Sequence, residues 1–331
     1  MLPDSTLDHL RRALRDVAEE PGRYELREPV GQGGMGTVYR AFDRTLERDV
    51  AVKVLRPGVG DAAASGRLVR EARILARLEH PGLVPVHDAG VLPDGRVFYV
   101  MKLVRGERLE RVAETVSNAD LLRLFLRICE TVGFAHAQGV IHRDLKPSNV
   151  MVGSFGEVLV LDWGIARLTR DAAAAGTAVG TDAGAIAQPV GDAPPADQTD
   201  TAPGTVLGTP GFMAPEQAQG WQHLVDARTD VYALGAILRS LLRPDQGAGR
   251  VVPPLVSIWS RAMAPEPAAR YPSAAALAAD ITRFLDGEPV EAHRESALER
   301  VGRLYRKYQT AIVLVLTYLV IRFLFLAARG L

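Results

Sequence analysis

Ten residues near the middle of the chain combine acidic, basic and amide side chains at short spacing. The run from Val140 to Asn149 reads Val-Ile-His-Arg-Asp-Leu-Lys-Pro-Ser-Asn. Asp144 can accept a proton from a substrate hydroxyl, and Asn149, five residues later, can bind a Mg²⁺ ion. A lone His-Arg-Asp is more often a solvated turn, but an Asn at this spacing is hard to reach by chance. The run therefore predicts phosphoryl transfer to a hydroxyl.

A glycine-rich stretch and a lysine upstream can hold a nucleotide. Residues 31–38 read Gly-Gln-Gly-Gly-Met-Gly-Thr-Val, a GxGxxGxV turn between strand patterns whose amides can close over phosphates. Lys53 follows in an apolar strand pattern, where an ammonium group needs a partner. Glu71 is the predicted partner, because it lies beside the apolar face of a helical stretch over 65–79. In isolation, an exposed helix carboxylate is the more common interpretation of Glu71, but beside these motifs the ion pair with Lys53 is favoured.

An acidic residue at the end of an apolar strand pattern supplies a second metal ligand. Residues 158–164 read Val-Leu-Val-Leu-Asp-Trp-Gly, so Asp162 can bind Mg²⁺ that bridges the β and γ phosphates. Three further features follow along the chain: Gly208-Thr-Pro-Gly-Phe-Met-Ala-Pro-Glu216, Asp230-Val-Tyr-Ala-Leu-Gly235 and Arg270.

The elements that must position these groups divide the chain into successive parts. Residues 24–101 read mostly as strands with one charged helix, whereas helical periodicity dominates over 118–138, 226–242, 254–264 and 273–286. Residues 171–204 contain no Lys, Arg, Leu or aromatic residue and are predicted to be disordered. The predicted division is a helical extension at 1–22, a small lobe at 23–104, a large lobe at 105–290 interrupted at 171–204, a basic juxtamembrane segment at 291–310 and a transmembrane helix at 311–328.

Length and charge narrow the class of protein. The 331 residues suffice for a two-lobed domain with appendages. The chain has 39 Lys and Arg residues and 39 Asp and Glu residues, so its formal net charge is zero. No overall positive charge therefore favours a nucleic acid partner. The single cysteine, Cys129, lies in an apolar helical pattern, which excludes a disulfide framework and predicts a buried thiol.

Residues 311–328 form an almost unbroken apolar run. As a helix the run would be about 27 Å long, close to the ~30 Å hydrocarbon thickness of a bilayer. Arg322 opposes insertion by about 2.5 to 3.5 kcal/mol, which the surrounding Leu, Ile, Val and Phe residues roughly offset. Basic residues upstream predict a single-pass anchor in the cytoplasmic membrane, with the catalytic portion in the cytoplasm: Arg300, Arg303, Arg306 and Lys307. The alternative is a buried or interfacial helix.

Taken in order, the motifs resemble those of bacterial eukaryotic-like (Hanks-type) serine/threonine protein kinases, from about Tyr24 to Leu285. The resemblance implies an α+β, two-lobed protein-kinase-like fold, with a small antiparallel-sheet lobe carrying one helix and a larger, mostly helical lobe. It implies transfer of the γ-phosphate of ATP to Ser/Thr hydroxyls of proteins, with Mg²⁺, or alternatively Mn²⁺, as the metal. Trp163 departs from the family's usual Asp-Phe-Gly but keeps the ring aromatic.

The resemblance also implies roles for the residues of the reaction. Asp144 would orient and deprotonate the acceptor hydroxyl, while Lys146 would contact the transferred phosphate. Thr209 would contact Asp144 and shape the acceptor site. An ion pair between Lys53 and Glu71 would hold the nucleotide phosphates. Asn149 and Asp162 would hold the metal.

The resemblance further implies a nucleotide site between the lobes, with a hinge at Met101 to Val104 and Met101 as gatekeeper. The residues implied to surround ATP are Gly31, Gln32, Gly33, Gly34, Gly36, Val38, Ala51, Lys53, Met101, Lys102, Val104 and Met151. Glu216 and Arg270 would form a buried ion pair of the large lobe, and Asp230 would brace the catalytic loop.

Regulation is expected to involve the segment after Asp162. Family members with an arginine at the Arg143 position are commonly switched by phosphorylation, because a phosphate near that arginine can order a mobile loop. The candidate sites, used by autophosphorylation in a transient homodimer, are Thr199, Thr201 and Thr205. The implied partners are therefore ATP, protein substrates, a second copy of the chain and membrane lipid around 311–328.

Two rival interpretations remain. A membrane-tethered pseudokinase scaffold would bind nucleotide without transferring phosphate, but the chain retains Lys53, Glu71, Asp144, Asn149 and Asp162 together. A small-molecule phosphotransferase of related fold is disfavoured by Lys146 and the Ala-Pro-Glu segment, which suit a protein substrate.

Overall fold

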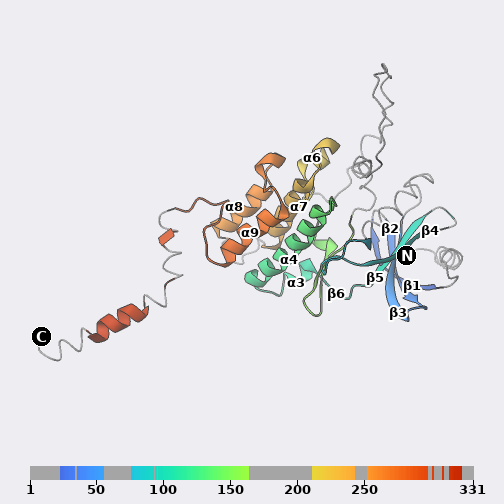
Figure 1. The fold of residues 1–331 in the computed structure, drawn as a ribbon, viewed down its shortest axis with the longest axis horizontal. Helices are drawn as coiled ribbons and strands as arrows, with labels where there is room; N and C mark the ends of the chain where they lie inside the picture. The colour runs from blue at the N-terminus through green and yellow to red at the C-terminus, as the bar shows by residue number, and fades with distance from the viewer. Residues whose placement is uncertain are drawn as a thin grey trace, which may run out of the picture.

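A computed structural model of the chain describes the elements that carry most of these motifs (Figure 1). The described residues are 23–33, 36–55, 76–92, 94, 96–163, 211–242, 252–296, 300–301, 308 and 313–322. The leading extension at 1–22, most of the helical stretch over 65–79 and the interruption at 171–204 lie outside them.

The first half of the described chain folds into a five-stranded sheet in which each neighbouring pair is antiparallel. In spatial order the strands are β1 (Tyr24–Gly33), β2 (Gly36–Asp43), β3 (Arg48–Leu55), β5 (Val97–Lys102) and β4 (Val86–Val91). The central strand β3 is buried continuously from Val50 to Leu55, because both of its faces are covered. Lys53 therefore lies in an apolar strand interior, as its sequence context predicts.

The second half is mostly helical and contains the larger apolar core. Its helices are α3 (Leu109–Val112), α4 (Asn118–Ala137), α6 (Pro215–Ala218), α7 (Ala227–Leu241), α8 (Pro253–Ala262) and α9 (Ala274–Leu285), with short 3₁₀ turns η1 (Pro147–Asn149), η3 (Gln222–Leu224) and η4 (Pro267–Ala269). Side chains of Ser117, Asp226 and Ser273 cap the N-termini of α4, α7 and α9. The four long helices expected from periodicity are confirmed to within two residues at each end.

The two lobes meet around a small second sheet that carries the catalytic loop. Its strands are β6 (Gly106–Arg108), β7 (Val150–Gly153) and β8 (Val158–Val160). The loop before β4 reaches this sheet through a bridge between Leu83 and Val160. A Cβ on Gly82 would lie 1.9 Å from Thr131 Oγ1, so only glycine allows this loop to approach α4 so closely. The antiparallel-sheet lobe and the helical lobe thus agree with the expected fold.

Residues 313–322 are helical and stand apart from both lobes in Figure 1. Every Val, Leu, Ile and Tyr side chain from 313 to 321 is 50–65% exposed. Within the part of the chain that is described, no helix combines the length and apolar character needed to cross a membrane. The predicted span at 311–328 extends beyond the described residues at both ends, so the transmembrane helix stays a prediction.

Candidate active site

The glycine-rich turn is a hairpin between β1 and β2. Gly33 pairs with Gly36 at its tip, and Gly31 pairs with Val38 further along the ladder. A Cβ on Gly36 would lie 2.2 Å from the carbonyl oxygen of Val54, so a side chain there would push β2 away from β3. Gln32 is exposed beside them, whereas Gly34 lies outside the described residues. The glycines therefore keep the backbone of this hairpin close to β3, and the hairpin stays the predicted cover of the phosphates.

The sheet aligns the other residues expected around a nucleotide. In its ladders Lys53 lies opposite Val38 on one side and Tyr99 on the other, and Ala51 lies opposite Met101. Lys102 ends β5, and Val104 follows in the linker to β6. On the large lobe Met151 is half-buried in β7. Their role in binding ATP stays a prediction.

Lys53 is buried, and its partner within the described residues is Asp162. Lys53 Nζ donates to Asp162 Oδ1 at 2.5 Å, which links β3 to the segment after β8. Burial lowers the pKa of Lys53, but Tyr99 and the Asp162 carboxylate outweigh it, so the pKa is raised and the ammonium form is stable. The predicted partner Glu71 lies outside the described residues.

The catalytic loop presents Asp144 beside Lys146 and Asn149. Lys146 Nζ donates to Asp144 Oδ2 at 3.0 Å, and both side chains are about a quarter exposed, at 24% and 26%. Asn149 Nδ2 donates to the carbonyl oxygen of Asp144 at 2.8 Å. The amide oxygen of Asn149 consequently remains available as a ligand. The site thus joins a carboxylate that can accept a proton with a cation that can contact a transferred phosphate.

Asp230 holds the backbone of this loop from α7. Its carboxylate accepts hydrogen bonds from the N–H groups of His142 and Arg143, both at 2.8 Å, and contacts His136 Nε2 at 2.8 Å. Burial raises the pKa of Asp230, but His136 and these N–H donors outweigh it and keep the carboxyl ionised. The geometry is consistent with the bracing role that the resemblance implies.

Asp162 and Trp163 form the turn that follows β8. Asp162 has a positive φ of 55°, an uncommon conformation for a non-glycine residue. Trp163 is buried with its ring 4.8 Å from that of His142, and its Nε1 donates to the carbonyl oxygen of Val160 at 3.1 Å. The Trp therefore fills a specific place in the core and carries a hydrogen bond that a phenyl ring cannot make.

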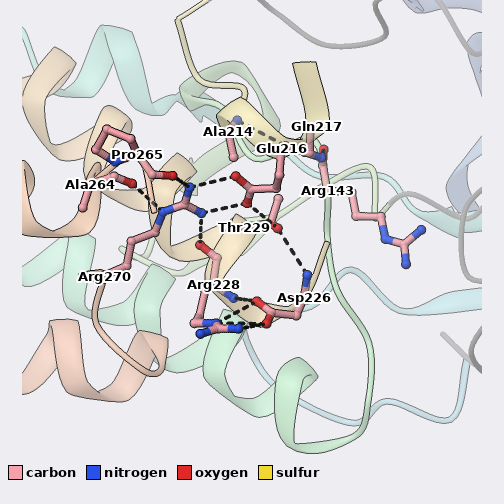
Figure 2. Close-up of polar contacts among 10 residues, drawn as sticks. All are labelled: Arg143, Ala214, Glu216, Gln217, Asp226, Arg228, Thr229, Ala264, Pro265 and Arg270. Atoms are coloured by element: carbon pink, nitrogen blue, oxygen red, sulfur yellow. Dashed lines mark hydrogen bonds and ion pairs between the residues drawn. The ribbon is translucent and has the colours of Figure 1, made fainter. Parts of the chain in front are cut away.

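A buried ion pair joins the Ala-Pro-Glu segment to the end of the helical lobe (Figure 2). Arg270 donates to both carboxylate oxygens of Glu216, at 2.7 and 2.8 Å, and Thr229 Oγ1 donates to Glu216 at 2.9 Å. Burial raises the pKa of Glu216, but Arg270 outweighs it and lowers the pKa overall. Thr209, seven residues upstream of Glu216, lies outside the described residues.

The residues present fit a nucleotide with a divalent cation. Asn149 and Asp162 offer oxygen ligands of the type that Mg²⁺ prefers, and the Lys53 ammonium can bind phosphate oxygens. Among the described residues, no group of three or more His, Cys, Asp and Glu side chains could hold a metal alone. A metal at this site would therefore depend on phosphate oxygens for further ligands.

Sequence reasoning missed three residues that shape this site. Tyr99 lies with its ring centre 6.0 Å from Lys53 Nζ, His136 contacts Asp230, and Gln217 donates to the Arg143 carbonyl. Their neighbours lie far away in the sequence, so no local spacing singles them out.

Comparisons with known proteins indicate which protein family the chain resembles. Residues 24–185 match the family model described as "Protein kinase domain". Residues 24–185 therefore resemble protein kinase domains. The predicted enzyme class, a protein-serine/threonine kinase, agrees with this match and with the relatives described next.

The chain is similar to several curated proteins named serine/threonine-protein kinase PknD. The protein from Chlamydia caviae is 35% identical over 310 residues, which cover 81% of this chain and 32% of the relative. The protein from Chlamydia trachomatis serovar D is 35% identical over 338 residues, covering 88% of this chain and 34% of the relative. The chain thus spans about a third of the length of these relatives.

The fold of the chain matches solved structures of protein kinase domains. The PknI kinase domain of Mycobacterium tuberculosis aligns with a TM-score of 0.55 and 25% identity, covering 79% of this chain and 96% of that structure. A second crystal structure of the same domain aligns with a TM-score of 0.54 and 24% identity, covering 82% of this chain and 97% of that structure. These likenesses confirm the two-lobed kinase fold.

Proposed function

We propose that this chain is a serine/threonine protein kinase that transfers the γ-phosphate of ATP to Ser/Thr hydroxyls of proteins. The observation that carries the proposal is the Lys53–Asp162 ion pair next to the loop of Asp144, Lys146 and Asn149, to which it is connected by the bond from the Leu161 N–H to the Asn149 carbonyl oxygen at 2.7 Å. The similarity to curated proteins named serine/threonine-protein kinase supports the acceptor class.

The residues divide the work of the reaction. Asp144 orients the acceptor hydroxyl and takes its proton, while Lys146, 3.0 Å away, balances charge on the transferred group. Lys53 holds the nucleotide phosphates and is kept charged by Asp162. Asn149 and Asp162 would hold Mg²⁺, which supplies charge neutralisation for the phosphates when bound. The site acts by positioning and electrostatics, because phosphoryl transfer needs little covalent chemistry from the protein.

Two finer parts of the proposal concern regulation and location. Autophosphorylation of Thr199, Thr201 or Thr205 would bring a phosphate to Arg143, whose φ of 67° marks a strained turn beside Asp144. Anchoring through 311–328 would place the kinase domain at the cytoplasmic face of a membrane. The exposed apolar side chains of 313–321 support the anchor, since a helix that is apolar all round is stable only when buried or in lipid.

The test is to incubate the full chain in detergent with labelled ATP, Mg²⁺ and a general protein acceptor, and to identify the labelled residues by mass spectrometry. We expect phosphoserine and phosphothreonine on the acceptor and phosphothreonine within 199–205 of the chain. Saturable nucleotide binding without any label would instead support a pseudokinase scaffold. Label on a free small-molecule hydroxyl alone would also contradict the proposal.

A further inference from the structure

The peptide group between Arg143 and Asp144 is held at both ends. The Asp144 N–H donates to His142 Nδ1 at 3.3 Å, and the Arg143 carbonyl oxygen accepts from Gln217 Nε2 at 2.8 Å. This peptide plane directly precedes the Asp144 Cα. Its orientation therefore sets the direction in which the Asp144 side chain leaves the backbone. The positive φ of Arg143, 67°, is a strained conformation that surrounding contacts must maintain.

Gln217 reaches this peptide from a different part of the fold. It lies in the short helix α6, and its Oε1 is 3.4 Å from the N–H of Ala214, which orients the side-chain amide. Nε2 therefore faces Arg143, as Figure 2 shows. Next to it, Glu216 is fixed by Arg270 and Thr229, so Gln217 projects from a firmly held support.

The other restraints on the loop act on different groups. Asp230 accepts from the N–H groups of His142 and Arg143, and Asn149 donates to the Asp144 carbonyl. Gln217 therefore contributes a separate restraint on the carbonyl of Arg143. Loss of this bond would allow the peptide to rotate and relieve the strain at Arg143.

We propose that Gln217 is a positioning residue for phosphoryl transfer, which acts by holding the Arg143 carbonyl and thereby aiming the Asp144 carboxylate at the acceptor hydroxyl. This inference rests on the proposed function. It assigns to Gln217 a contribution to the transfer step and none to nucleotide binding, because the hydrogen bonds of Gln217 with other described residues go to Ala214 and Arg143.

The variants that best separate the two hydrogen bonds of this side chain are Gln217→Leu and Gln217→Glu. Leu has a similar volume but makes neither hydrogen bond, whereas Glu keeps the acceptor for Ala214 and loses the donor to Arg143. Truncation to Ala is less suitable, because Gln217 lines a small cavity with Phe212 and Met213, where water could replace the lost bond. Gln219→Leu is the matched control, since Gln219 lies at the exposed end of the same helix.

The measurement is kcat and KM for ATP with the full chain and a protein acceptor, together with Tm. Loss of one hydrogen bond predicts a kcat lower by roughly three- to tenfold in both variants. We expect KM for ATP to stay near the wild-type value, Tm to fall by no more than about 2 to 4 °C, and Gln219→Leu to leave all three unchanged. The two Gln217 variants should behave alike because each lacks the donor.

Unchanged kcat in Gln217→Leu would overturn the inference while leaving the proposed function intact. A fall in kcat accompanied by an equal weakening of ATP binding and a larger fall in Tm would also overturn it, because that pattern reports loss of structure. A wild-type chain that binds ATP and transfers no phosphate would overturn the proposed function and, with it, the catalytic role of Gln217.

Discussion

At the scale of single residues, Trp163 shows how this site uses a side chain that the resemblance leaves unexplained. Its ring packs against His142, and its Nε1 donates to the carbonyl of Val160. Burial lowers the pKa of His142, so the ring stays neutral: Nδ1 can accept from Asp144 while Nε2 donates to the carbonyl of Leu161. Trp163 thus supports the histidine that contacts the backbone of Asp144.

Replacing Trp163 with Phe should separate ring packing from hydrogen bonding. Trp163→Phe keeps an aromatic ring beside His142 but leaves the buried carbonyl of Val160 without this donor. We expect a loss of about 1 to 3 kcal/mol in the free energy of unfolding, with phosphate transfer largely retained. Urea unfolding measures the loss. Trp221→Phe is the control, because Trp221 is 47% exposed, and an equal loss there would contradict the account.

At the scale of elements, Arg270 connects segments that are distant in the sequence. Besides Glu216 in α6, its guanidinium donates to the carbonyl oxygens of Ala264, Pro265 and Arg228. The Arg270 side chain is 0% exposed, and all of its polar contacts are satisfied within the protein. The segment that carries Gln217 is therefore fixed to α7 and to the turn after α8.

Removing one partner of the ion pair between Arg270 and Glu216 should strongly destabilise the fold. Arg270→Met leaves the Glu216 carboxylate buried without its cation, which costs about 3 to 5 kcal/mol. The double variant Glu216→Gln with Arg270→Met should recover part of that loss, because no uncompensated charge remains. Arg228→Met is the control: its pair with Asp226 is 36% and 44% exposed and should contribute less than about 1 kcal/mol. Equal losses in the two single Arg variants would refute this description.

Asp280 in α9 holds the segment that follows this helix. Its buried carboxylate accepts from Tyr271 Oη at 2.7 Å and from the N–H groups of Glu291 and Ala292 at 2.7 and 3.0 Å. Burial raises the pKa of Asp280, but these donors outweigh it and hold the pKa below its ordinary value. The chain after α9 is thereby fixed to the helical lobe.

The depressed pKa predicts how stability depends on pH. The Asp280 carboxylate contributes stability that is fully present above its unfolded pKa of about 3.9 and is lost as the pH falls through the lower folded pKa. Asp280→Asn should therefore be less stable than the wild type at pH 7, and the gap in Tm should narrow below about pH 4. Thermal unfolding between pH 3 and pH 7 tests this, and a constant gap would contradict it.

At the scale of the whole molecule, the sequence predicts the two lobes and the reactive side chains. It does not predict the tertiary hydrogen bonds that hold those side chains in place. Asp144 and Asn149 are recognisable because their chemistry fixes their spacing, and α4, α7, α8 and α9 follow from apolar periodicity. The bond from Gln217 to Arg143 spans 74 residues, and that from His136 to Asp230 spans 94. Such contacts depend on tertiary packing, which no local pattern encodes.

The C-terminal apolar run gives a prediction for the location of the whole chain. If 311–328 inserts into a bilayer, the full chain should sediment with membranes and resist extraction at alkaline pH and high salt, whereas a chain ending at Tyr308 should not. Arg322→Leu should leave the full chain in the membrane, since it removes the one charge in the run. Release of the full chain by salt alone would rule out a spanning anchor.

The central claim is that Asp144 acts within a phosphotransfer site, and a single comparison tests it most directly. The measurement is the rate of γ-phosphate transfer from ATP to a protein acceptor at saturating Mg²⁺ and ATP, for the wild type and Asp144→Asn. We predict transfer by the wild type and a decrease of about 10²- to 10⁴-fold in the variant, with ATP affinity retained. Equal rates in the two proteins, or no transfer by a wild type that binds ATP, would contradict the account.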